Sequence, residues 1–547
     1  MIPRRDLWLI LSLLAIAFAA SASGLGNGFV FDDRAIVVDN FRVHTLVGLW
    51  HSFAEPYWPP EVGAALYRPV TIVLFKLEWA LGAGAPWAFH AANVLLYLAV
   101  VAAIFRLAKL ILPLPAAWLT AALFSVQPVH VEAVANTVGQ SELVVGLLAV
   151  VATAWYVTAR RSGKLSWITI AGLAALYLVM CFTKEHGVVL PGLLVVTEFT
   201  LLERPRPARG RALLAALVAV AALFLVARTA VLGGLAGDIA NTSIRGAGLG
   251  DRALTMLAVV PQWIRLLLFP WHLQADYMPR ELDLATTFGL PQLIGALLLC
   301  AMVGLTVWSR RRAPAVCFGL CWTGIALFPV SNLAVPTGIL LAERALFLPS
   351  VGAVFALGGG IAAAIPKFVA APVGERRVVL AALGILLGLG LWRSSTRQLV
   401  WRDNDTLFRR TVLDAPLSYK AHWAYGSVLV GSGDLERAEL EYRIALRLYQ
   451  ADPNLFSDYG DLYVRKRQCG PAIPLYLKSL SLAPEQWKVR SKLVLCYLDL
   501  GKVAEARAEA DQKTLRRDPD AVRIQSVIDS LTAAFVQFPP PQTGPQN

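Results

Sequence analysis

Residues 211–232 read RALLAALVAVAALFLVARTAVL, a run long and apolar enough to cross a lipid bilayer, which takes about 20 mostly apolar residues as a helix. Similar runs follow one another from the N-terminus to about residue 391. Over the 547 residues, 57% are hydrophobic and 16% are charged, and the mean hydropathy is +0.58. Soluble proteins carry about 25% charged residues. This composition argues against a soluble globular enzyme, a disordered chain and a collagen-like fibre, and we predict an all-α, polytopic membrane protein.

Eleven segments of the sequence qualify as spanning helices. They cover residues 7–23, 87–107, 114–128, 140–158, 165–182, 187–203, 211–232, 286–308, 313–330, 343–364 and 377–393. Lysine and arginine gather in the cytoplasmic loops of membrane proteins, and the basic clusters here, beginning with Arg4 and Arg5, fall on alternate connections. We therefore predict a multi-pass protein with a cytoplasmic N-terminus and a C-terminal part in a periplasm-like or lumen-like compartment. A bacterial inner membrane is a separate expectation. The same rule accounts for the net charge of +13, so no nucleic-acid partner is expected.

Two other apolar segments, residues 69–82 and 252–270, contain charged side chains and are excluded from this count. Charges at the centre of a bilayer cost several kcal/mol, so we predict that both segments lie at the outer interface or dip into the membrane and return. The first span has an alternative, because a basic start, an apolar run and Ala-Ser-Ala at 20–22 also resemble a cleaved signal peptide. Either interpretation exports the loop that follows, residues 24–86.

The sequence changes character after Trp401, where it becomes amphipathic and repeats itself at a spacing of 34 residues. The matched positions hold small or aromatic side chains: Gly426 and Gly460; Ala438, Ala472 and Ala506; Tyr442 and Tyr476; Tyr463 and Tyr497. Small residues let paired helices approach closely, and aromatic residues fill the space beside them. This spacing and pattern are typical of tetratricopeptide repeats, of which we predict about three.

These patterns divide the chain into three parts. We predict a membrane domain over residues 1–393, a helical repeat solenoid over 394–538 and a disordered tail over 539–547. The concave surface of such a solenoid usually holds an extended peptide or another protein, although a structural plug or a dimer contact is an alternative. Cys469 and Cys496 share the exported side, and the sequence leaves open whether they pair.

Ionisable residues gather on the predicted outer side of the membrane. They lie in the first exported loop and at later outer connections: Asp32, Asp33, Arg68, His130, Glu132, Lys184, Glu185, Glu343 and Arg344. Such groups cost free energy at a membrane boundary and therefore suggest a function. Pro128 and Gly139 break the helices beside them, as a site between spans requires.

These residues also have structural alternatives. Asp32 and Asp33 could form a turn or cap a helix, and Lys184 could be a snorkelling anchor. His130 and Glu132 could pair with each other to hold a loop, and Glu343 and Arg344 could form an internal ion pair that locks a helix. The aromatic residues of the first loop could form an interfacial belt. The chemical interpretation is that paired acids raise each other's proton affinity, which suits a general base, and that arginine binds phosphate in a bidentate manner.

Several motifs resemble those of the transmembrane and tetratricopeptide-repeat O-mannosyltransferases. They are Phe-Asp-Asp at 31–33, Tyr-Arg-Pro at 67–69, PVHVEAVA at 128–135, Lys-Glu at 184–185 and, most specifically, FPVSNL at 328–333 and LAERALFLPSVG at 341–352. The sequence departs from the family at Gln127, where a histidine is common, and at 139–142, where Gly-Gln-Ser-Glu replaces Gly-Arg-Ala-Asp. The resemblance covers nearly the whole chain and marks it as a divergent, bacterial-type relative. It implies a C-type polytopic glycosyltransferase fold and transfer of mannose from a polyprenyl-phosphate carrier to Ser or Thr of exported proteins.

A mechanism follows as an expectation. The resemblance favours an acid of the first loop, Asp32 or Asp33, as the base that accepts the proton of the incoming hydroxyl, and the residues do not decide between them. Arg344 and Lys184 are candidates to hold the donor phosphate. The residues expected to orient the sugar or the acceptor are His130, Glu132, Glu185, Glu343 and Arg68. A single displacement would invert the anomeric carbon; neither a cofactor nor a metal is expected, and the repeats would bind the exported acceptor polypeptide.

Three other functions stay open. A transporter or flippase for a lipid-linked saccharide would need paired half-repeats with broken helices, and the apolar segments show no internal repeat. A non-catalytic scaffold would recruit exported proteins through its repeats, tolerate substitution of Asp32, Asp33 and Arg344, and be sensitive only in the groove of the repeats. An enzyme of the same architecture that acts on a glycolipid would tolerate removal of residues 401–547.

Overall fold

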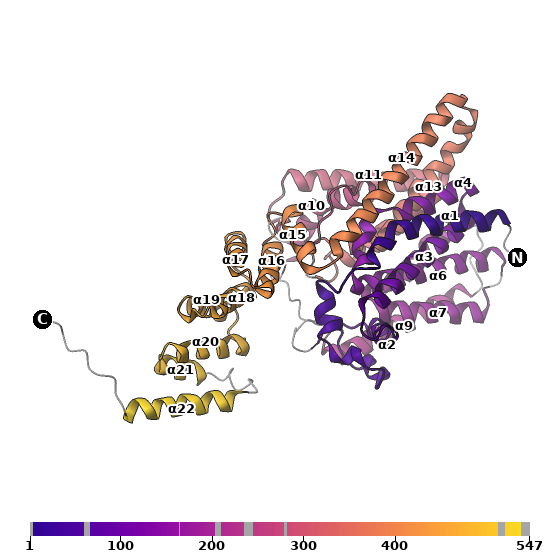
Figure 1. The fold of residues 1–547 in the computed structure, drawn as a ribbon. Coiled ribbons are helices and arrows are strands. Elements are labelled where there is room, and N and C mark those ends of the chain that lie inside the picture. Colours follow the sequence, from indigo (N-terminus) through magenta and orange to yellow (C-terminus); the bar gives the residue numbers. More distant parts are fainter. Residues whose placement is uncertain are drawn as a thin grey trace. The chain divides into compact units, whose positions relative to one another are not determined.

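The chain is described by a computed structural model (Figure 1). The described residues are 4–59, 66–163, 165–202, 209–234, 244, 246–277, 282–337, 339–511 and 520–537. They form helices and connecting loops without a β-strand among them, which confirms the predicted all-α class. The tail predicted to be disordered, 539–547, lies outside these residues. Two compact units are present, one formed by Met1–Met278 and Leu282–Asp414 and the other by Pro279–Glu281 and Ala415–Asn547.

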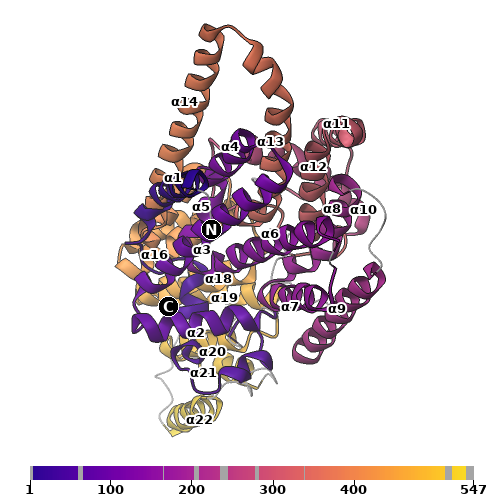
Figure 2. The ribbon, with the colours of Figure 1, turned by 90° about the vertical axis from the view of Figure 1, so that its right-hand side faces the viewer.

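The first unit is a bundle in which every predicted span coincides with a helix (Figures 1 and 2). These helices are α1 (Arg4–Ser21), α3 (Pro86–Ile111), α4 (Leu114–Ser125), α6 (Gln140–Arg161), α7 (Trp167–Thr183), α8 (Leu190–Leu201), α9 (Gly210–Leu232), α11 (Leu290–Arg312), α12 (Pro314–Leu327), α13 (Phe347–Ala370) and α14 (Val373–Gln398). The two excluded segments are also helical, as α2 (Pro69–Gly82) and α10 (Leu249–Leu268). Figure 2 shows the α13–α14 hairpin projecting beyond the other helices.

Length and composition alone support fewer spans than eleven. Among the described residues, seven helices are long and apolar enough to cross a membrane, and an eighth is added if one bent pair counts as a single span. The helices α7 and α12 are apolar but shorter. The protein therefore has the helices of an integral membrane protein, while the number of spans and their orientation stay predictions.

The bent pair is the break expected at Pro128. The helix α4 and the segment Pro128–Ala135 meet at 48°, because proline lacks the N–H that would continue the backbone ladder. The second predicted break, Gly139, packs against the preceding helical turn, where an added Cβ would lie 2.4 Å from the carbonyl oxygen of Ala133. Only glycine fits so close to a backbone, and the chain can therefore turn sharply into α6.

Basic residues gather at one end of the bundle. The ammonium of Lys109 contacts Asp6, the guanidinium of Arg161 contacts the carbonyl oxygen of Leu110, and Arg209 donates to the carbonyl oxygen of Leu165 at 3.2 Å. The beginning of α1, the ends of α3 and α6 and the beginning of α9 therefore share this end. Asp33 of the first loop, which is predicted to be exported, accepts the backbone N–H of Val138 just before α6. The first loop and this turn therefore lie at the opposite end of α6 from its basic end.

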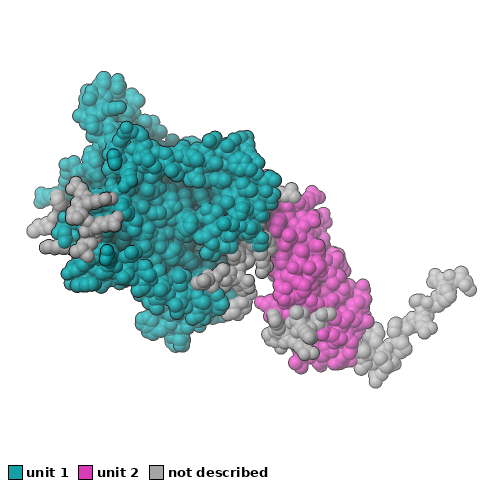
Figure 3. Space-filling view, turned by 180° about the vertical axis from the view of Figure 1, so that it is seen from behind, with its two compact units in different colours: residues 1–278, 282–414 teal, residues 279–281, 415–547 magenta. Residues whose placement is uncertain are grey.

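The second unit, shown apart from the first by colour in Figure 3, consists of paired helices. They are α16 (Tyr419–Ser432), α17 (Leu435–Leu448), α18 (Pro453–Arg465), α19 (Cys469–Leu482), α20 (Trp487–Asp499), α21 (Val503–Ala510) and α22 (Ala521–Gln537). A Cβ added to Gly460 would lie 2.5 Å from the ring of Tyr476, which explains why glycine and tyrosine recur together. The Cys469 and Cys496 thiols are free and belong to one small core between α19 and α20. The helix α15 (Asn404–Asp414), which precedes this unit, belongs to the bundle.

Candidate functional site

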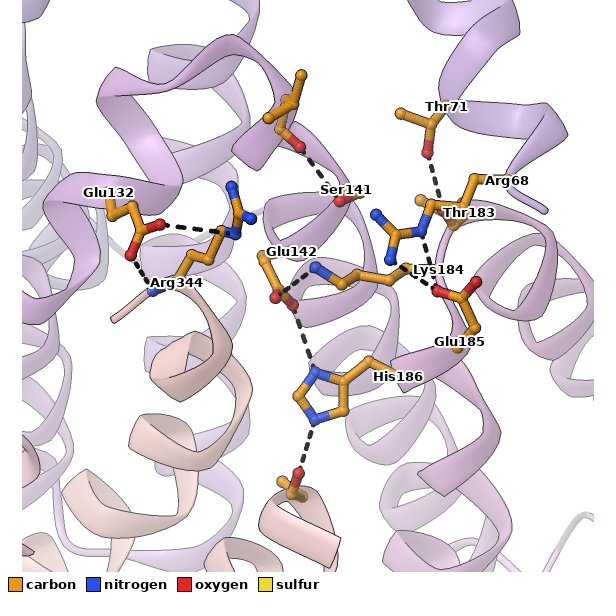
Figure 4. A network of polar contacts seen from close by, with 12 residues as sticks. Arg68, Thr71, Glu132, Ser141, Glu142, Thr183, Lys184, Glu185, His186 and Arg344 are labelled. Atoms are coloured by element: carbon orange, nitrogen blue, oxygen red, sulfur yellow. Dashed lines mark hydrogen bonds and ion pairs between the residues drawn. The ribbon is translucent and has the colours of Figure 1, made fainter. Parts of the chain in front are cut away.

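Carboxylates and cations alternate at the end of the bundle opposite the basic connections (Figure 4). The group, called the charged cluster below, consists of Asp32, Arg68, Glu132, Glu142, Lys184, Glu185, Arg228 and Arg344. Its residues come from the first loop, the beginnings of α2, α6 and α13, the short helix α5 (Val131–Ala135), the turn after α7, and α9. Six of the nine predicted site residues belong to it, and segments more than 300 residues apart meet here.

Arg344 joins two acids at one side of the cluster. Its Nη1 lies 3.0 Å from Asp32 Oδ2 and its Nε lies 3.5 Å from Glu132 Oε1. Glu132 also accepts the backbone N–H of Arg344 at 2.9 Å. The Glu132 side chain is only 3% exposed, whereas that of Asp32 is 19% exposed. Glu132 therefore fixes the guanidinium from inside the bundle, and Asp32 is the more accessible of its two partners.

Lys184 lies at the centre, where its Nζ is 2.6 Å from Glu142 Oε1. The other oxygen of Glu142 is 3.4 Å from Nδ1 of His186, whose Nε2 is 2.6 Å from the carbonyl oxygen of Ala326. Burial lowers the pKa of Lys184; Glu142 opposes this shift, and the positive charges of Arg68 and Arg344 add to it. Three cations thus lie close enough to repel one another, which is an arrangement that suits an anionic ligand.

Arg68 and Arg228 share Glu185 at the far side of the cluster. Glu185 Oε2 is 2.8 Å from Arg68 Nη2, and its Oε1 is 2.9 Å from Arg228 Nη1. Burial would raise the pKa of Glu185, but the two guanidinium groups outweigh it and hold the pKa at about 2. The ring of Tyr57 lies 5.1 Å from the Arg68 guanidinium, and the buried Tyr57 hydroxyl has no hydrogen-bond partner in the described part of the chain.

The two neighbouring acids of the first loop have different surroundings. Asp33 is fully buried and accepts backbone N–H groups of Val30, Thr137 and Val138 at 3.0–3.3 Å. Burial raises its pKa to about 7, although these hydrogen bonds act in the opposite direction. Asp33 therefore connects the first loop to the turn before α6 through hydrogen bonds, whereas the Asp32 carboxylate forms an ion pair with Arg344.

Two other predicted residues also lie apart from the charged cluster. His130 is buried, with Nδ1 at 3.1 Å from the Tyr97 hydroxyl and Nε2 at 2.8 Å from the Ser350 hydroxyl. Glu343 accepts a hydrogen bond from the Tyr277 hydroxyl at 2.8 Å, whereas the neighbouring Arg344 pairs with Asp32 and Glu132. The described residues form no cluster of three or more His, Cys, Asp or Glu side chains that could hold a metal ion. His130 therefore joins α3 to α13, and Glu343 joins the segment before α13 to the loop after α10.

Sequence reasoning gave no role to Tyr57 and Arg228 in the site. Arg228 interrupts an otherwise apolar run, and a charged residue at such a position is itself a signal of function or pairing. No comparable signal exists for Tyr57, because a tyrosine in an aromatic-rich loop between predicted spans is equally typical of an interfacial belt. Glu142, although recognisable as an acid at the outer edge of a span, becomes the partner of Lys184 only in the folded chain.

The buried position of Asp33 predicts a pH-dependent stability. Its pKa is about 7 in the folded chain against an ordinary value of 3.8, so the folded state keeps a proton that the unfolded chain has lost. The resulting stabilisation is fully present below pH 3.8 and is lost as the pH rises through about 7. We expect the melting temperature of the wild type, measured in detergent, to fall over this range more steeply than that of Asp33→Asn. Equal slopes for the two proteins would contradict this assignment.

Comparisons with known proteins agree with both parts of the chain. The tetratricopeptide-repeat family model matches residues 405–453 and 458–522. The chain is 25% identical to Protein O-mannosyl-transferase Tmtc3 of Drosophila melanogaster, over 88% of this chain and 60% of that protein. It is 25% identical to Protein O-mannosyl-transferase TMTC3 of Homo sapiens, over 86% of this chain and 55% of the relative. It is 26% identical to Protein O-mannosyl-transferase TMTC4 of Homo sapiens, over 80% of this chain and 65% of that relative. The chain thus spans little more than half the length of the first two relatives. These matches confirm the predicted repeats and the predicted resemblance.

Proposed function

We propose that this chain, which is similar to protein O-mannosyl-transferases over most of its length, transfers a mannosyl group from a polyprenyl phosphate to a Ser or Thr hydroxyl of an exported protein. The observation that carries this proposal is the 3.0 Å contact between Asp32 and Arg344. It joins a candidate base to a candidate phosphate-binding cation at one end of the bundle. A lipid-linked donor would present its phosphate and its sugar at that boundary, with the polyprenyl tail between the helices.

The charge balance of the cluster suggests how the donor acts on the base. Four carboxylates face four cations, so an incoming phosphate has to compete with a carboxylate for a cation. Of the two acids that pair with Arg344, Asp32 is the more easily displaced, because it is the more exposed and, unlike Glu132, does not also accept the Arg344 backbone N–H. When the donor binds, Arg344 would pair with its phosphate in place of Asp32, and the Asp32 carboxylate would become free to accept a proton.

The transfer itself is a single displacement. The acceptor oxygen forms a bond to the anomeric carbon, the bond from that carbon to the phosphate oxygen breaks, and the hydroxyl proton passes to Asp32. The departing polyprenyl phosphate keeps the electron pair, and its negative charge is stabilised by Arg344 together with Lys184 or Arg68. Attack opposite the leaving group inverts the configuration of the sugar.

The direct test uses the purified full chain in lipid nanodiscs with a synthetic polyprenyl-phosphate mannose and a peptide containing Ser and Thr. We expect mass spectrometry to show the gain of one hexose on a hydroxyl residue, and nuclear magnetic resonance to show inversion at the anomeric carbon. A matched reaction with the corresponding glucose donor measures the preference for the sugar. Retention of configuration, or modification of a glycolipid in place of the peptide, would contradict the proposal.

The repeats are proposed to hold the acceptor polypeptide. A chain that ends at Asp414 keeps the bundle and loses the repeat unit. We expect it to lose at least about tenfold in transfer to a full-length protein acceptor, because tethering of the acceptor raises its concentration at the site. Transfer to a short peptide should persist, which also shows that the truncated chain is folded. Unchanged transfer to the full-length protein acceptor would contradict the proposal that the repeats hold the acceptor.

A further inference from the structure

A cavity of about 420 Å³ lies in the first unit, where the second half of α14 meets the loop after α10. Its polar and aromatic lining consists of Trp271, His272, Trp392, Arg393, Arg410 and Asp414. No residue of the charged cluster lines it. A cavity of this size falls within the range of small-molecule sites, which starts at about 300 Å³, and a bare phosphate ion would fill only part of it.

The cavity lies at the expected boundary between the membrane and water. Trp392 and Arg393 are the last residues of the predicted span 377–393, and Trp271 follows the apolar helix α10 closely. The two tryptophan rings are 6.3 Å apart and each is about half exposed. Tryptophan and arginine together are typical of the headgroup level of a bilayer, where one part of the ligand is apolar and the other is charged.

Positive charge is in excess around the cavity. The single carboxylate of its lining, Asp414, is already shared by Arg397 at 2.7 Å and Arg410 at 2.9 Å. Arg393 donates Nε and Nη2 to the neutral carbonyl oxygen of Trp271, at 3.2 and 2.9 Å. Glu343 lies within electrostatic reach of Arg393 but is bound to Tyr277. The three guanidinium groups of Arg393, Arg397 and Arg410 therefore outnumber the two carboxylates, even when Glu343 is counted with Asp414.

We propose that this cavity binds the phosphate headgroup of a membrane lipid. Arg393 would donate its remaining N–H groups to the phosphate, in the charge-assisted geometry that guanidinium forms with phosphate oxygens, and Arg410 would move from Asp414 to the same ligand. Trp271 and Trp392 would pack on the first carbons of the lipid. The site is distinct from the cations proposed to hold the donor phosphate, and it stands whether or not the chain is a glycosyltransferase.

The test is native mass spectrometry of the full chain after delipidation, with three separate probes: phosphatidylglycerol, farnesyl phosphate and inorganic phosphate. We expect the wild type to retain a lipid probe and Arg393→Gln/Arg410→Gln to bind it about tenfold more weakly or worse. Arg402→Gln is the matched control, because Arg402 is exposed and pairs with the adjacent Asp403. Phosphatidylglycerol or farnesyl phosphate, whichever binds more tightly, identifies the source of the headgroup.

A conservative variant shows whether weaker lipid binding results from loss of the positive charge or from loss of folding. Arg393→Lys keeps the positive charge and should bind the lipid far better than Arg393→Gln, and both single variants should have the melting temperature of Arg402→Gln. Equal lipid binding by the wild type and the glutamine variants would overturn the proposal. Binding of inorganic phosphate as tight as that of either lipid would also overturn it, because the tryptophans would then contribute nothing.

Discussion

Asparagine in place of Asp32 is expected to abolish sugar transfer while the protein stays folded. An amide oxygen still accepts a hydrogen bond from Arg344 Nη1, which is 3.0 Å from the carboxylate in the wild type, but an amide cannot take a proton at neutral pH. Since a general base contributes about 10²–10⁴-fold, kcat for transfer to a peptide should fall by about 10³-fold. The melting temperature should change little, because Arg344 keeps the carboxylate of Glu132 as its partner and the asparagine oxygen still accepts its hydrogen bond.

The same loop supplies two controls for this experiment. Asp39 is a 63% exposed carboxylate that lies 4.0 Å from Arg34, and Asp39→Asn should keep wild-type transfer. Asp33→Asn should lose stability instead, because its new NH₂ group would face at least one of the three backbone N–H groups that the carboxylate accepts. Full activity of Asp32→Asn in the presence of saturating donor would remove Asp32 from the mechanism.

The fold was predictable because its signals are local. A long apolar run is sufficient to predict a helix, and each of the eleven runs is helical in the structure. The break at Pro128 follows from the chemistry of one residue. The repeat pairs also follow from local contacts, since Gly460 and the Tyr476 that covers it are separated by only one turn between helices.

The candidate site was predictable only as a set of residues. Sequence motifs and predicted sidedness identified Asp32, Glu132, Lys184 and Arg344 as belonging to one surface, and the structure places them in one cluster. Their individual partners depend on segments far away in the chain. Whether Asp33 or its neighbour faces Arg344 is decided by backbone groups at 137–138, which lie more than 100 residues downstream. No local pattern contains that information.

Removal of the Arg344 cation is expected to affect both stability and activity. Glutamine at this position would leave Glu132, which is 3% exposed, as a buried carboxylate without a cation. Removing one member of a buried ion pair costs about 3–5 kcal/mol, so Arg344→Gln should melt far below the wild type. Transfer should be lost as well, because the leaving phosphate loses the guanidinium proposed to stabilise it. Thermal unfolding in detergent and the peptide assay measure the two effects separately.

The double variant Glu132→Gln/Arg344→Gln separates the two roles. It removes the buried charge together with its partner, and replacement of both members of a buried pair is often close to neutral. We expect it to recover most of the lost stability and none of the transfer activity. Arg34→Gln, at an exposed position of the first loop, is the control for loss of an arginine and should match the wild type in both assays. A double variant that regained transfer would show that the guanidinium serves only to neutralise Glu132, and the donor phosphate would then have to be held by Lys184 and Arg68.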